Sequence, residues 1–413
     1  MSVLLVSENF PPRIGGAGTY AAELCRSLPA GSVAVLTHEP GDPRAAAAFD
    51  AGFPHPVARV PMQFESWGKL GLRGWRRYAA LNDAVRRALP EGATSLLANR
   101  CLPEGEAVRC VAAAQRLPYA VVVHGEELNT ASTSRELAFL TRRVLHRAAR
   151  VVANSQHTRS LLVGQWGVSD KRIAVVTPGV DVNAITPADP AERDTLRARL
   201  AWPDAPVVLT AGRLQHRKGH DRMIEAWRSV AAELPAARWV VIGDGPRRAA
   251  LQDLAYQRGV ADSIVWRGDV PRDELIASYR AADLFALPNR TVDGDFEGFG
   301  IVLLEAQAAG RPTICGRSGG APETLVDRVT GRVVDATSSA ELANTLLDLL
   351  LDPSELERMG RQARAHVEVN HARPRATTRF TEALHALGVP STHDVPSASA
   401  RELAAPPGLR PAA

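Results

Sequence analysis

Apolar and polar positions alternate along most of the chain in two patterns. Short runs of valine, leucine, isoleucine and alanine are typical of strands buried on both faces of a parallel sheet. The stretches between them, such as 135–149 and 220–234, repeat apolar residues at helical spacing. This alternation predicts α/β architecture with parallel sheets covered by helices. The predicted strands are 2–6, 32–37, 94–98, 119–123, 150–154, 172–176, 206–211, 238–242, 263–267, 283–287 and 312–315.

Eleven strands are too many for one ordinary doubly wound sheet, so we expect two Rossmann-like domains that face a deep cleft. Prolines cluster over 178–206 and mark the break between the domains. The last segment holds five prolines and no periodicity, which predicts disorder. The expected organisation is a first domain over 1–178, a linker over 179–205, a second domain over 206–372, a helix over 373–388 that crosses back to the first domain, and a disordered tail over 389–413.

The amino-acid composition excludes several classes of protein. Of 413 residues, 45% are apolar and 23% charged, which excludes a largely disordered chain, a collagen-like chain and a disulfide scaffold. Residues 1–178 carry 21 basic and 14 acidic side chains, whereas residues 179–413 carry 28 and 31. A positive first half favours an anionic ligand or an anionic membrane surface there, and no basic run of the nucleic-acid-binding type occurs. Only three of the 49 basic residues are lysines, Lys69, Lys171 and Lys218.

The sequence also predicts a compartment. The four cysteines have no paired spacing, which is typical of a reducing cytoplasm and argues against a zinc cluster. The N-terminus lacks the charged and apolar regions of a signal peptide. No run approaches the ~18 apolar residues of a membrane span. We therefore expect a cytoplasmic protein whose contact with a membrane is peripheral.

A glycine-rich loop lies between the first predicted strand and a predicted helix over 19–28. Glycines let the backbone approach a ligand closely, and the start of a helix offers free N–H groups to an anion. A dinucleotide fingerprint, Gly16-x-Gly18-x-x-Ala21 with Glu39 further on, is one alternative. Eight residues separate the strand from the first glycine, however, and the fingerprint should follow the strand directly. A plain turn is the other alternative.

Two further loops follow predicted strands and carry candidate groups. His124 follows the strand 119–123 and precedes a glycine, at the edge of the sheet where ligands bind, although a lone histidine is often structural. Arg213 and Lys218 follow the strand 206–211, and two fixed cations there suit a diphosphate. A solvated basic loop is the alternative, which the rarity of lysine in this chain disfavours.

A third segment combines two carboxylates with the start of a helix near Gly300. The free amides of residues 298–301 would face a phosphate or a sugar oxygen. Glu297 precedes this helix and Glu305 lies inside it, so both suit sugar and ribose hydroxyls. An acid/base pair of the hydrolase type is disfavoured, because cations belong to the same predicted cleft. Asp293-Gly294-Asp295 resembles a metal motif but is interpreted as a solvated loop without a metal.

Together these segments resemble glycosyltransferase family 4, the retaining nucleotide-sugar transferases of GT-B fold. The resemblance extends to about residue 388 and is strongest from Leu287 through the Glu297-x7-Glu305 element to Thr324. It is especially close to the phosphatidylinositol and phosphatidylinositol-mannoside mannosyltransferases that use GDP-mannose. The loop 289–296 is about one residue shorter than in those enzymes, which leaves the sugar open.

The resemblance implies roles for individual residues. Arg213 and Lys218 would neutralise the departing diphosphate, Glu297 would bind sugar hydroxyls, and Glu305 would bind the ribose. His124 would contact the transferred sugar and the phosphate, and no protein nucleophile or metal is implied. The residues implied to contact the donor are Gly15, Gly16, His124, Arg213, Lys218, Val270, Glu297, Gly298, Phe299, Gly300, Ile301 and Glu305.

The acceptor has a separate signal in the first half. Residues 66–78 interleave tryptophan, tyrosine, leucine and cations, a mixture suited to anionic lipid at a membrane interface. Three glycines weaken this segment as a helix. An ordinary loop and helix packed on the domain is the alternative.

We therefore expect a retaining, metal-independent hexosyltransferase without a cofactor, which moves mannose from GDP-mannose to a lipid-linked or glycan acceptor. A GT-B sugar-nucleotide epimerase, an NAD-dependent oxidoreductase and a non-catalytic binding protein remain alternatives. The epimerase needs acid/base carboxylates in the first domain, which the sequence does not mark.

Overall fold

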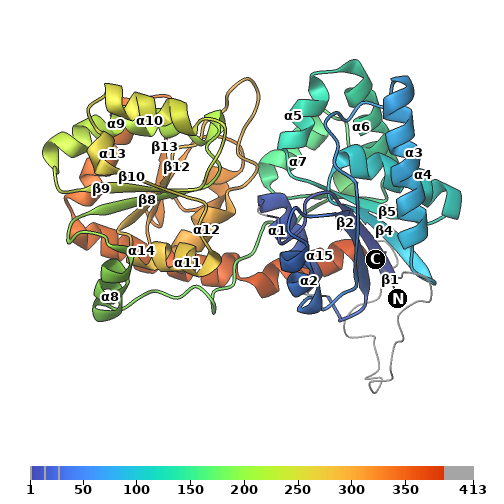
Figure 1. The fold of residues 1–413 in the computed structure, drawn as a ribbon, viewed down its shortest axis with the longest axis horizontal. Coiled ribbons are helices and arrows are strands. Elements are labelled where there is room, and N and C mark those ends of the chain that lie inside the picture. The colour runs from blue at the N-terminus through green and yellow to red at the C-terminus, as the bar shows by residue number, and fades with distance from the viewer. Residues whose placement is uncertain (1, 14, 27, 386–413) are drawn as a thin grey trace.

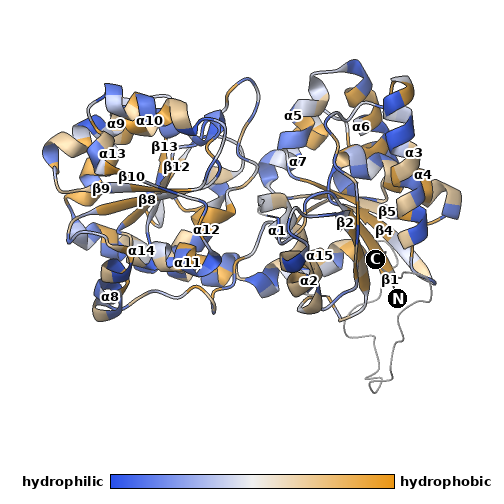
Figure 2. Cartoon of the chain, in the orientation of Figure 1, coloured by the Kyte–Doolittle hydropathy of each residue, from blue (hydrophilic) through white to orange (hydrophobic). Residues whose placement is uncertain are grey.

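The computed structural model describes residues 2–13, 15–26 and 28–385. Two α/β domains lie side by side, each with a central parallel sheet between layers of helices (Figure 1). The strands are mostly apolar, and the outward faces of the helices are mostly polar (Figure 2). The structure thus confirms the two doubly wound, Rossmann-like domains that the alternation of strands and helices predicted.

The first sheet has seven strands in the order β3-β2-β1-β4-β5-β6-β7, and every pairing is parallel. Helices cover both faces, and α1, α2 and α15 pack on one face while α3, α4 and α6 pack on the other. The strands are β1 (Ser2–Ser7), β2 (Val33–His38), β3 (Val57–Val60), β4 (Ala93–Ala98), β5 (Tyr119–Val123), β6 (Arg150–Ala153) and β7 (Ile173–Val175). The helices are α1 (Gly16–Arg26), α2 (Pro43–Ala51), α3 (Gly71–Ala88), α4 (Glu106–Gln115), α5 (Glu126–Ser132), α6 (Arg135–Arg147) and α7 (Gln156–Gly164).

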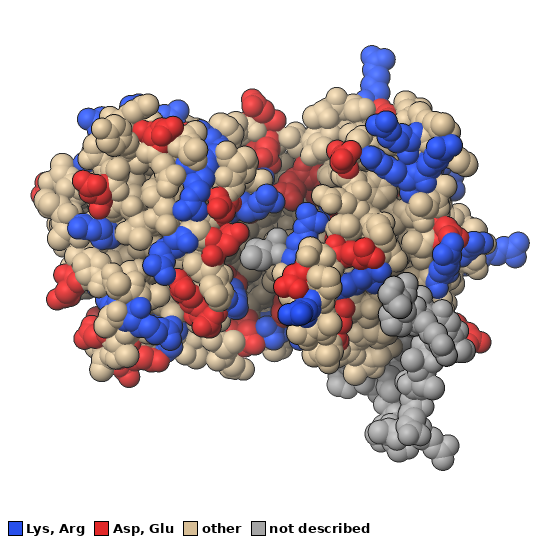
Figure 3. Space-filling model, viewed as in Figure 1, with Lys and Arg blue, Asp and Glu red and all other residues tan. Residues whose placement is uncertain are grey.

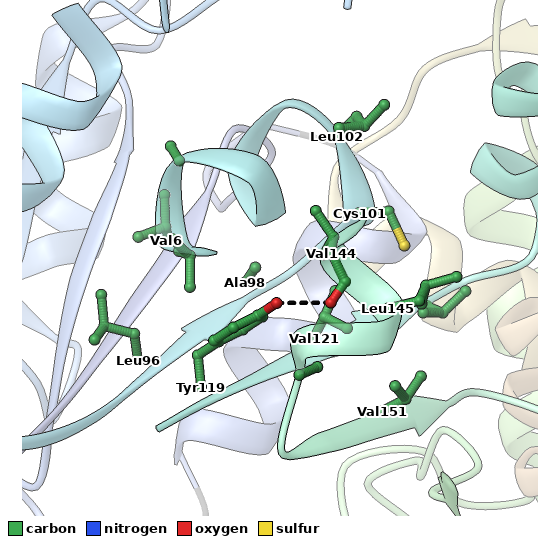
Figure 4. Packing of buried hydrophobic residues seen from close by; sticks show 14 of the residues in the cluster. Val6, Leu96, Ala98, Cys101, Leu102, Tyr119, Val121, Val144, Leu145 and Val151 are labelled. Carbon is green, nitrogen blue, oxygen red and sulfur yellow. Dashed lines mark hydrogen bonds between the residues drawn. The ribbon is translucent and has the colours of Figure 1, made fainter. Parts of the chain in front are cut away.

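The core of the first domain is mostly aliphatic (Figure 4). Tyr119 is buried between β4 and α6, and its hydroxyl donates to the carbonyl oxygen of Val144 at 2.6 Å. A buried tyrosine hydroxyl needs such a partner, because leaving it unpaired costs about 1–3 kcal/mol.

The second sheet has six strands in the order β10-β9-β8-β11-β12-β13, again all parallel. Its two faces are covered by α9, α10 and α13 on one side and by α8, α11, α12 and α14 on the other. The strands are β8 (Val207–Ala211), β9 (Arg238–Ile242), β10 (Ile264–Gly268), β11 (Leu284–Leu287), β12 (Thr313–Gly316) and β13 (Gly331–Val334). The helices are α8 (Pro190–Leu200), α9 (His220–Glu233), α10 (Arg248–Gln257), α11 (Arg272–Ala281), α12 (Ile301–Ala308), α13 (Ser339–Leu350) and α14 (Pro353–Asn370).

Two strands are missing from the sequence prediction, β3 and β13, and each lies at the edge of its sheet. Both are four residues long and include an arginine, and no residue of β3 is fully buried. An edge strand pairs on one side only, so its sequence needs no continuous apolar run. The pattern of apolar runs therefore does not indicate these two strands.

Segments between and after the domains are also ordered. Within the predicted linker 179–205, α8 packs on the second domain, and Arg193 and Arg197 both pair with Asp283. After α14 the chain returns to the first domain as α15 (Arg373–His385), whose Phe380 is buried in the same cluster as the side chains of α1. The predicted tail 389–413 lies outside the described residues.

The segment 66–78 contains the start of a helix, although its glycines lower the helix propensity. Helix α3 begins at Gly71, and Gly74 lies in its first turn. A Cβ at Gly74 would stand 2.7 Å from the carbonyl oxygen of Gly68, so the glycine lets the preceding chain cross close to the helix. Glu136 of α6 accepts a hydrogen bond from the backbone N–H of Leu70 at 2.6 Å. These tertiary contacts offset the low helix propensity of glycine, about 1 kcal/mol per residue.

The strand orders place the predicted site residues together. The order reverses between β1 and β4 in the first sheet and between β8 and β11 in the second, and ligands bind beyond the carboxyl ends of strands at such points. Gly15 and Gly16 follow β1, Lys218 follows β8 and Glu297 follows β11. The molecule is hollowed between the two domains in the space-filling view (Figure 3).

Candidate functional site

Lys218 and Glu297 form the charged centre of the second domain's side of the cleft. The Lys218 Nζ donates to Glu297 Oε2, and each residue is only 8% exposed. Gly219 holds this arrangement, because its φ is +75° and a Cβ there would stand 1.8 Å from the carbonyl oxygen of Pro288. The loop after β8 therefore packs directly on the end of β11, which brings a lysine and a glutamate 79 residues apart into contact.

The ionisation of Glu297 depends on its cationic neighbours. Burial disfavours the charged carboxylate, but the positive charges of Lys218 and Arg217 outweigh burial and hold the pKa of Glu297 below its ordinary value. Glu297 is thus an anion at neutral pH and can accept hydrogen bonds from hydroxyl groups. An incoming anionic ligand would compete with it for Lys218.

Arg213 lies at the start of the same loop and is exposed. Its guanidinium makes no ion pair or hydrogen bond with the described residues. An unpaired guanidinium beside a buried lysine suits bidentate binding of a phosphate oxygen pair. The structure thus places both predicted cations on one loop, Lys218 paired and Arg213 free of protein partners among the described residues.

Helix α12 begins beside this centre. Gly300 precedes it with φ of +91°, which confirms the predicted helix start, and its first turn contains no acidic residue. Phe299 is buried in the second domain's core, while Ile301 packs against the core cluster of the first domain. The free amides at this end of α12 therefore lie at the junction of the two domains, where their partial positive charge favours an anion.

Glu305, one turn into α12, already has partners within the protein. The hydroxyl of Tyr279 donates to its Oε2 at 2.8 Å, and Arg272 pairs with its Oε1 at 2.7 Å. These two groups therefore stabilise the buried carboxylate within the protein. The Arg272 side chain is 55% exposed and can move aside for a ligand. Val270 is half-buried in the loop after β10 and packs on the same cluster as α12.

His124 approaches the site from the first domain. Its Nε2 lies 2.9 Å from the carbonyl oxygen of Asn99, and burial lowers its pKa to about 4, so the ring is neutral at pH 7. Its backbone N–H donates to Glu127 Oε1 at 2.9 Å. A Cβ at Gly298 would stand 2.3 Å from the carbonyl oxygen of His124. His124 thus lies directly against the loop that carries Glu297.

Gly15 and Gly16 are connected to His124 through Asn99. The Asn99 side chain donates to the carbonyl oxygen of Ala17 in the first turn of α1, and its backbone carbonyl contacts the histidine ring. A Cβ at Gly15 or Gly16 would meet no heavy atom within 4 Å, so space remains open at this end of α1. Among the described residues, no hydrogen bond or ion pair joins these glycines to Lys218 or Glu297.

Sequence reasoning missed a set of contacts that join the domains. Arg217 pairs with Glu126 of α5 at 2.9 Å and with Asp295 at 3.1 Å. Asp295 thus has an ion-pair partner, although its side chain is 42% exposed and Asp293 and Gly294 beside it are exposed. Glu323 accepts hydrogen bonds at 2.8 Å from two backbone N–H groups at the start of α7. Only the packing of α5 and α7 against the second domain reveals these partners.

Three buried carboxylates of the first domain were also missed. Glu8 and Glu104 both pair with Arg100, at 3.4 and 3.2 Å, and Glu127 is 2% exposed beside His124. Burial raises the pKa of Glu8 above its ordinary value and that of Glu127 to about 7. They follow β1, β4 and β5, so the order of the sheet, and no local motif, brings them together.

Among the described residues, no group of three or more His, Cys, Asp or Glu residues is arranged to hold a metal ion. No helix in the same part of the chain is long and apolar enough to cross a membrane.

Family models match both halves of the chain. Residues 14–184 match the model described as Glycosyltransferase Family 4, and residues 192–366 match that described as Glycosyl transferases group 1. A GDP-mannose-dependent alpha-(1-6)-phosphatidylinositol monomannoside mannosyltransferase of Mycobacterium tuberculosis is 35% identical over 373 residues, which are 88% of this chain and 93% of that protein. The protein of the same name from Mycolicibacterium smegmatis is 33% identical over 375 residues, 87% and 91% of the two chains.

Solved structures agree on the fold. The Anabaena protein HepE, in complex with UDP and glucose, superposes with a TM-score of 0.78 at 21% identity and covers 93% of this chain and 99% of its own. WaaG, a glycosyltransferase involved in lipopolysaccharide biosynthesis, superposes with a TM-score of 0.71 at 19% identity over 94% and 100% of the two chains. The chain therefore belongs to glycosyltransferase family 4 and is a hexosyltransferase of GT-B fold.

Proposed function

We propose that the protein transfers mannose from GDP-mannose to a lipid-linked acceptor with retention of the anomeric configuration. The observation that carries this proposal is the buried Lys218–Glu297 pair beside the free amides of α12, opposite His124. The relatives from Mycobacterium tuberculosis and Mycolicibacterium smegmatis, named as GDP-mannose-dependent enzymes, support the donor. Their names also support a phosphatidylinositol-linked acceptor.

In this mechanism the protein supplies charge and position. Lys218, Arg213 and the amides of 298–301 receive the negative charge that grows on the diphosphate as the sugar leaves. Glu297 holds sugar hydroxyls and Glu305 the ribose, while Gly15 and Gly16 face the diphosphate from the first domain. The acceptor hydroxyl attacks from the face that the diphosphate leaves, and a diphosphate oxygen takes its proton. These positive groups do the work that a metal ion does in other transferases, so we expect full activity in the presence of EDTA.

The donor is tested by thermal unfolding with a panel of GDP-, UDP- and ADP-sugars. A ligand that binds only the folded state stabilises it by about 2.7 kcal/mol at a hundred times its Kd. We expect GDP-mannose to raise Tm most, by roughly 5–11 °C, since 1 kcal/mol shifts Tm by about 2–4 °C for a domain of this size. Equal shifts with UDP-sugars would contradict the choice of donor, and no shift with any nucleotide sugar would contradict the site.

An epimerase remains the second candidate, because Glu8, Glu104 and Glu127 place buried carboxylates in the first domain. Two of them are engaged by Arg100, and Glu127 accepts the backbone N–H of His124, so these groups have structural partners. Incubation with GDP-mannose and no acceptor separates the two functions. The transferase leaves the sugar unchanged apart from slow hydrolysis, whereas an epimerase yields a second nucleotide sugar that proton NMR resolves.

The lipid acceptor brings the protein to the cytoplasmic face of a membrane in this proposal, through the outer side of the first domain. Within 66–78, Trp67 and Tyr78 pack inward, but Leu70, Leu72 and Trp75 are 79%, 65% and 60% exposed. Phe139 of the neighbouring α6 is also 60% exposed, with Arg143 over its ring. Basic side chains gather on this outer part of the first domain (Figure 3). Exposed apolar groups among cations suit an anionic bilayer.

The variant Leu72→Ser/Trp75→Ser tests this membrane contact. We expect the protein to co-sediment with vesicles that contain phosphatidylglycerol, and the double variant to lose most of that binding, because burial of two large apolar side chains drives it. Tyr256→Ser is the matched control, since Tyr256 is 80% exposed on α10 of the second domain. Equal binding of all three proteins would contradict the proposed contact.

A further inference from the structure

His124 is held through its backbone and through the ring atom Nε2. Its backbone N–H donates to Glu127 Oε1 at 2.9 Å, and its carbonyl oxygen accepts from Asn154 Nδ2 at 3.0 Å. Nε2 lies 2.9 Å from the carbonyl oxygen of Asn99 and 3.2 Å from the side-chain Oδ1 of the same residue. The other ring atom, Nδ1, makes no hydrogen bond with the described residues and is not fully buried. Nδ1 is therefore the polar atom of His124 that is open to a ligand.

Asn99 decides which ring nitrogen of His124 carries the proton. Both atoms of Asn99 that approach Nε2 are oxygens without a hydrogen, so they can only accept. The side-chain amide cannot be turned round, because its Nδ2 donates to Ser7 Oγ at 2.9 Å and to the carbonyl oxygen of Ala17 at 3.2 Å. The Ser7 hydroxyl gives its own hydrogen to the carbonyl oxygen of Asn9, so it accepts from Asn99. Nε2 must therefore carry the hydrogen.

The second ring nitrogen is left with a lone pair. Burial lowers the pKa of His124 to about 4, so at pH 7 the ring holds a single proton, and that proton is on Nε2. Tyr20 packs edge-on against the ring, with 5.8 Å between the ring centroids, and helps to keep its orientation. Nδ1 is therefore a fixed hydrogen-bond acceptor, on a residue that lies against the loop of Glu297.

We propose that Asn99 is a positioning residue, which makes His124 the acceptor of a hydrogen bond from a substrate hydroxyl and prevents its ring from binding the diphosphate. The proposal rests on the proposed function, because it concerns the substrates of that reaction. The phosphates that link a nucleoside to a sugar carry no hydrogen at neutral pH, so they offer nothing that Nδ1 can accept. Their oxygens and the lone pair of Nδ1 repel each other, whereas a hydroxyl donates to Nδ1.

The consequence is a division of roles within the site. In the proposed mechanism Arg213, Lys218 and the amides of 298–301 attract the diphosphate. His124 adds affinity only when a hydroxyl reaches Nδ1, from the transferred sugar or from the acceptor. With the proton on Nδ1 instead, the same ring would donate to a phosphate oxygen and would retain the nucleoside diphosphate, which is the product of the transfer.

Nuclear magnetic resonance of the histidine rings tests the proton position in the wild-type protein at pH 7, without substrate. Correlation of ring hydrogens with ¹⁵N through two bonds distinguishes a proton on Nε2 from one on Nδ1. We expect the signal of His124, assigned by its absence from His124→Asn, to show the proton on Nε2. A proton on Nδ1, or on both nitrogens, would overturn the proposal whatever the enzyme's substrates are.

Calorimetry with GDP and GDP-mannose, together with the KM for phosphatidylinositol monomannoside as the acceptor probe, identifies the hydroxyl. His124→Gln places its amide near the position of Nε2 and loses the acceptor at Nδ1, whereas His124→Asn keeps an oxygen near Nδ1. If the hydroxyl belongs to the transferred sugar, His124→Gln should bind GDP-mannose about tenfold more weakly and GDP unchanged. If it belongs to the acceptor, both nucleotides should bind unchanged and the KM should rise about tenfold. His124→Asn should stay closer to the wild type. Equal weakening of GDP and GDP-mannose would overturn the proposal, as would wild-type values throughout.

A double-mutant cycle shows whether Asn99 acts through His124. We expect Asn99→Ala to lower kcat/KM about tenfold, for the substrate that His124→Gln affects, and to have no further effect in the His124→Gln background. Asn183→Ala is the matched control, since Asn183 is an exposed asparagine before α8, and it should leave kcat/KM unchanged. Equal losses in both backgrounds would show a merely structural role for Asn99. Failure of GDP and GDP-mannose to bind the wild type would instead count against the proposed function.

Discussion

Replacement of Lys218 by alanine is expected to lower kcat for sugar transfer by about a thousandfold. Lys218 is the buried cation of the cleft, and an electrostatic group aimed at charge that develops in the transition state contributes roughly 10²–10³ in rate. Its effect is enlarged here because the site is buried, so water screens the charge poorly. The measurement is kcat with GDP-mannose and acceptor, together with unfolding by denaturant.

Stability must be separated from activity in this variant. Lys218→Ala leaves Glu297 as a buried carboxylate without its main partner, and breaking one side of a buried pair costs about 3–5 kcal/mol. The double variant Lys218→Ala/Glu297→Gln removes that buried charge, so it should regain stability and stay inactive. Lys171→Ala, an exposed lysine of the first domain, should behave as wild type. Near-wild-type turnover of both Lys218→Ala and Glu297→Ala would refute the site.

The variant Gly298→Ala is expected to reduce kcat/KM by about a hundredfold through the contact between the domains. The added Cβ would stand 2.3 Å from the carbonyl oxygen of His124 in the other domain, well inside van der Waals contact. The carbonyl group of His124 belongs to the backbone and cannot rotate away as a side chain can, so the domains must move apart to relieve the overlap. A displacement of about 1 Å at a catalytic centre costs on the order of 10² in rate.

Small-angle X-ray scattering is the second readout for Gly298→Ala, because a wider cleft increases the radius of gyration. The matched control is Gly164→Ala at the end of α7, where a Cβ meets no heavy atom within 4 Å. The control should keep both kcat/KM and the radius of gyration. Wild-type catalysis by Gly298→Ala would show that the contact between His124 and Gly298 is not part of the active arrangement.

Much of the fold was predictable because parallel strands are buried on both faces. A strand such as 119–123 must be apolar at every position, so the sequence alone marks it and its helical neighbours. The edge strands β3 and β13 were not predicted, because an edge strand need not be apolar at every position. Helix α3 forms despite its glycines, because contacts with Glu136 and the close approach at Gly74 override local propensity.

The candidate site, too, was predictable from the sequence only in part. Lys218, Glu297 and the start of α12 follow strands within short motifs, so their residue types and spacing were informative. Arg217, Glu126 and Glu323 bind across the cleft, and nothing in their own segments marks those partners. The buried carboxylates around Arg100 come from three separate loops, which only the strand order brings together.

By itself, the sequence determined two parallel α/β domains, the loops that carry charge, and the family. These features depend on local patterns, in which each strand and loop is specified by its own residues. Only the tertiary structure decided which residues meet. Lys218 pairs with Glu297, and Tyr279 and Arg272 bind Glu305. Gly298 lies against the backbone of His124. The physical reason is that ion pairing and steric contact act over a few ångströms in space, whatever the separation along the chain.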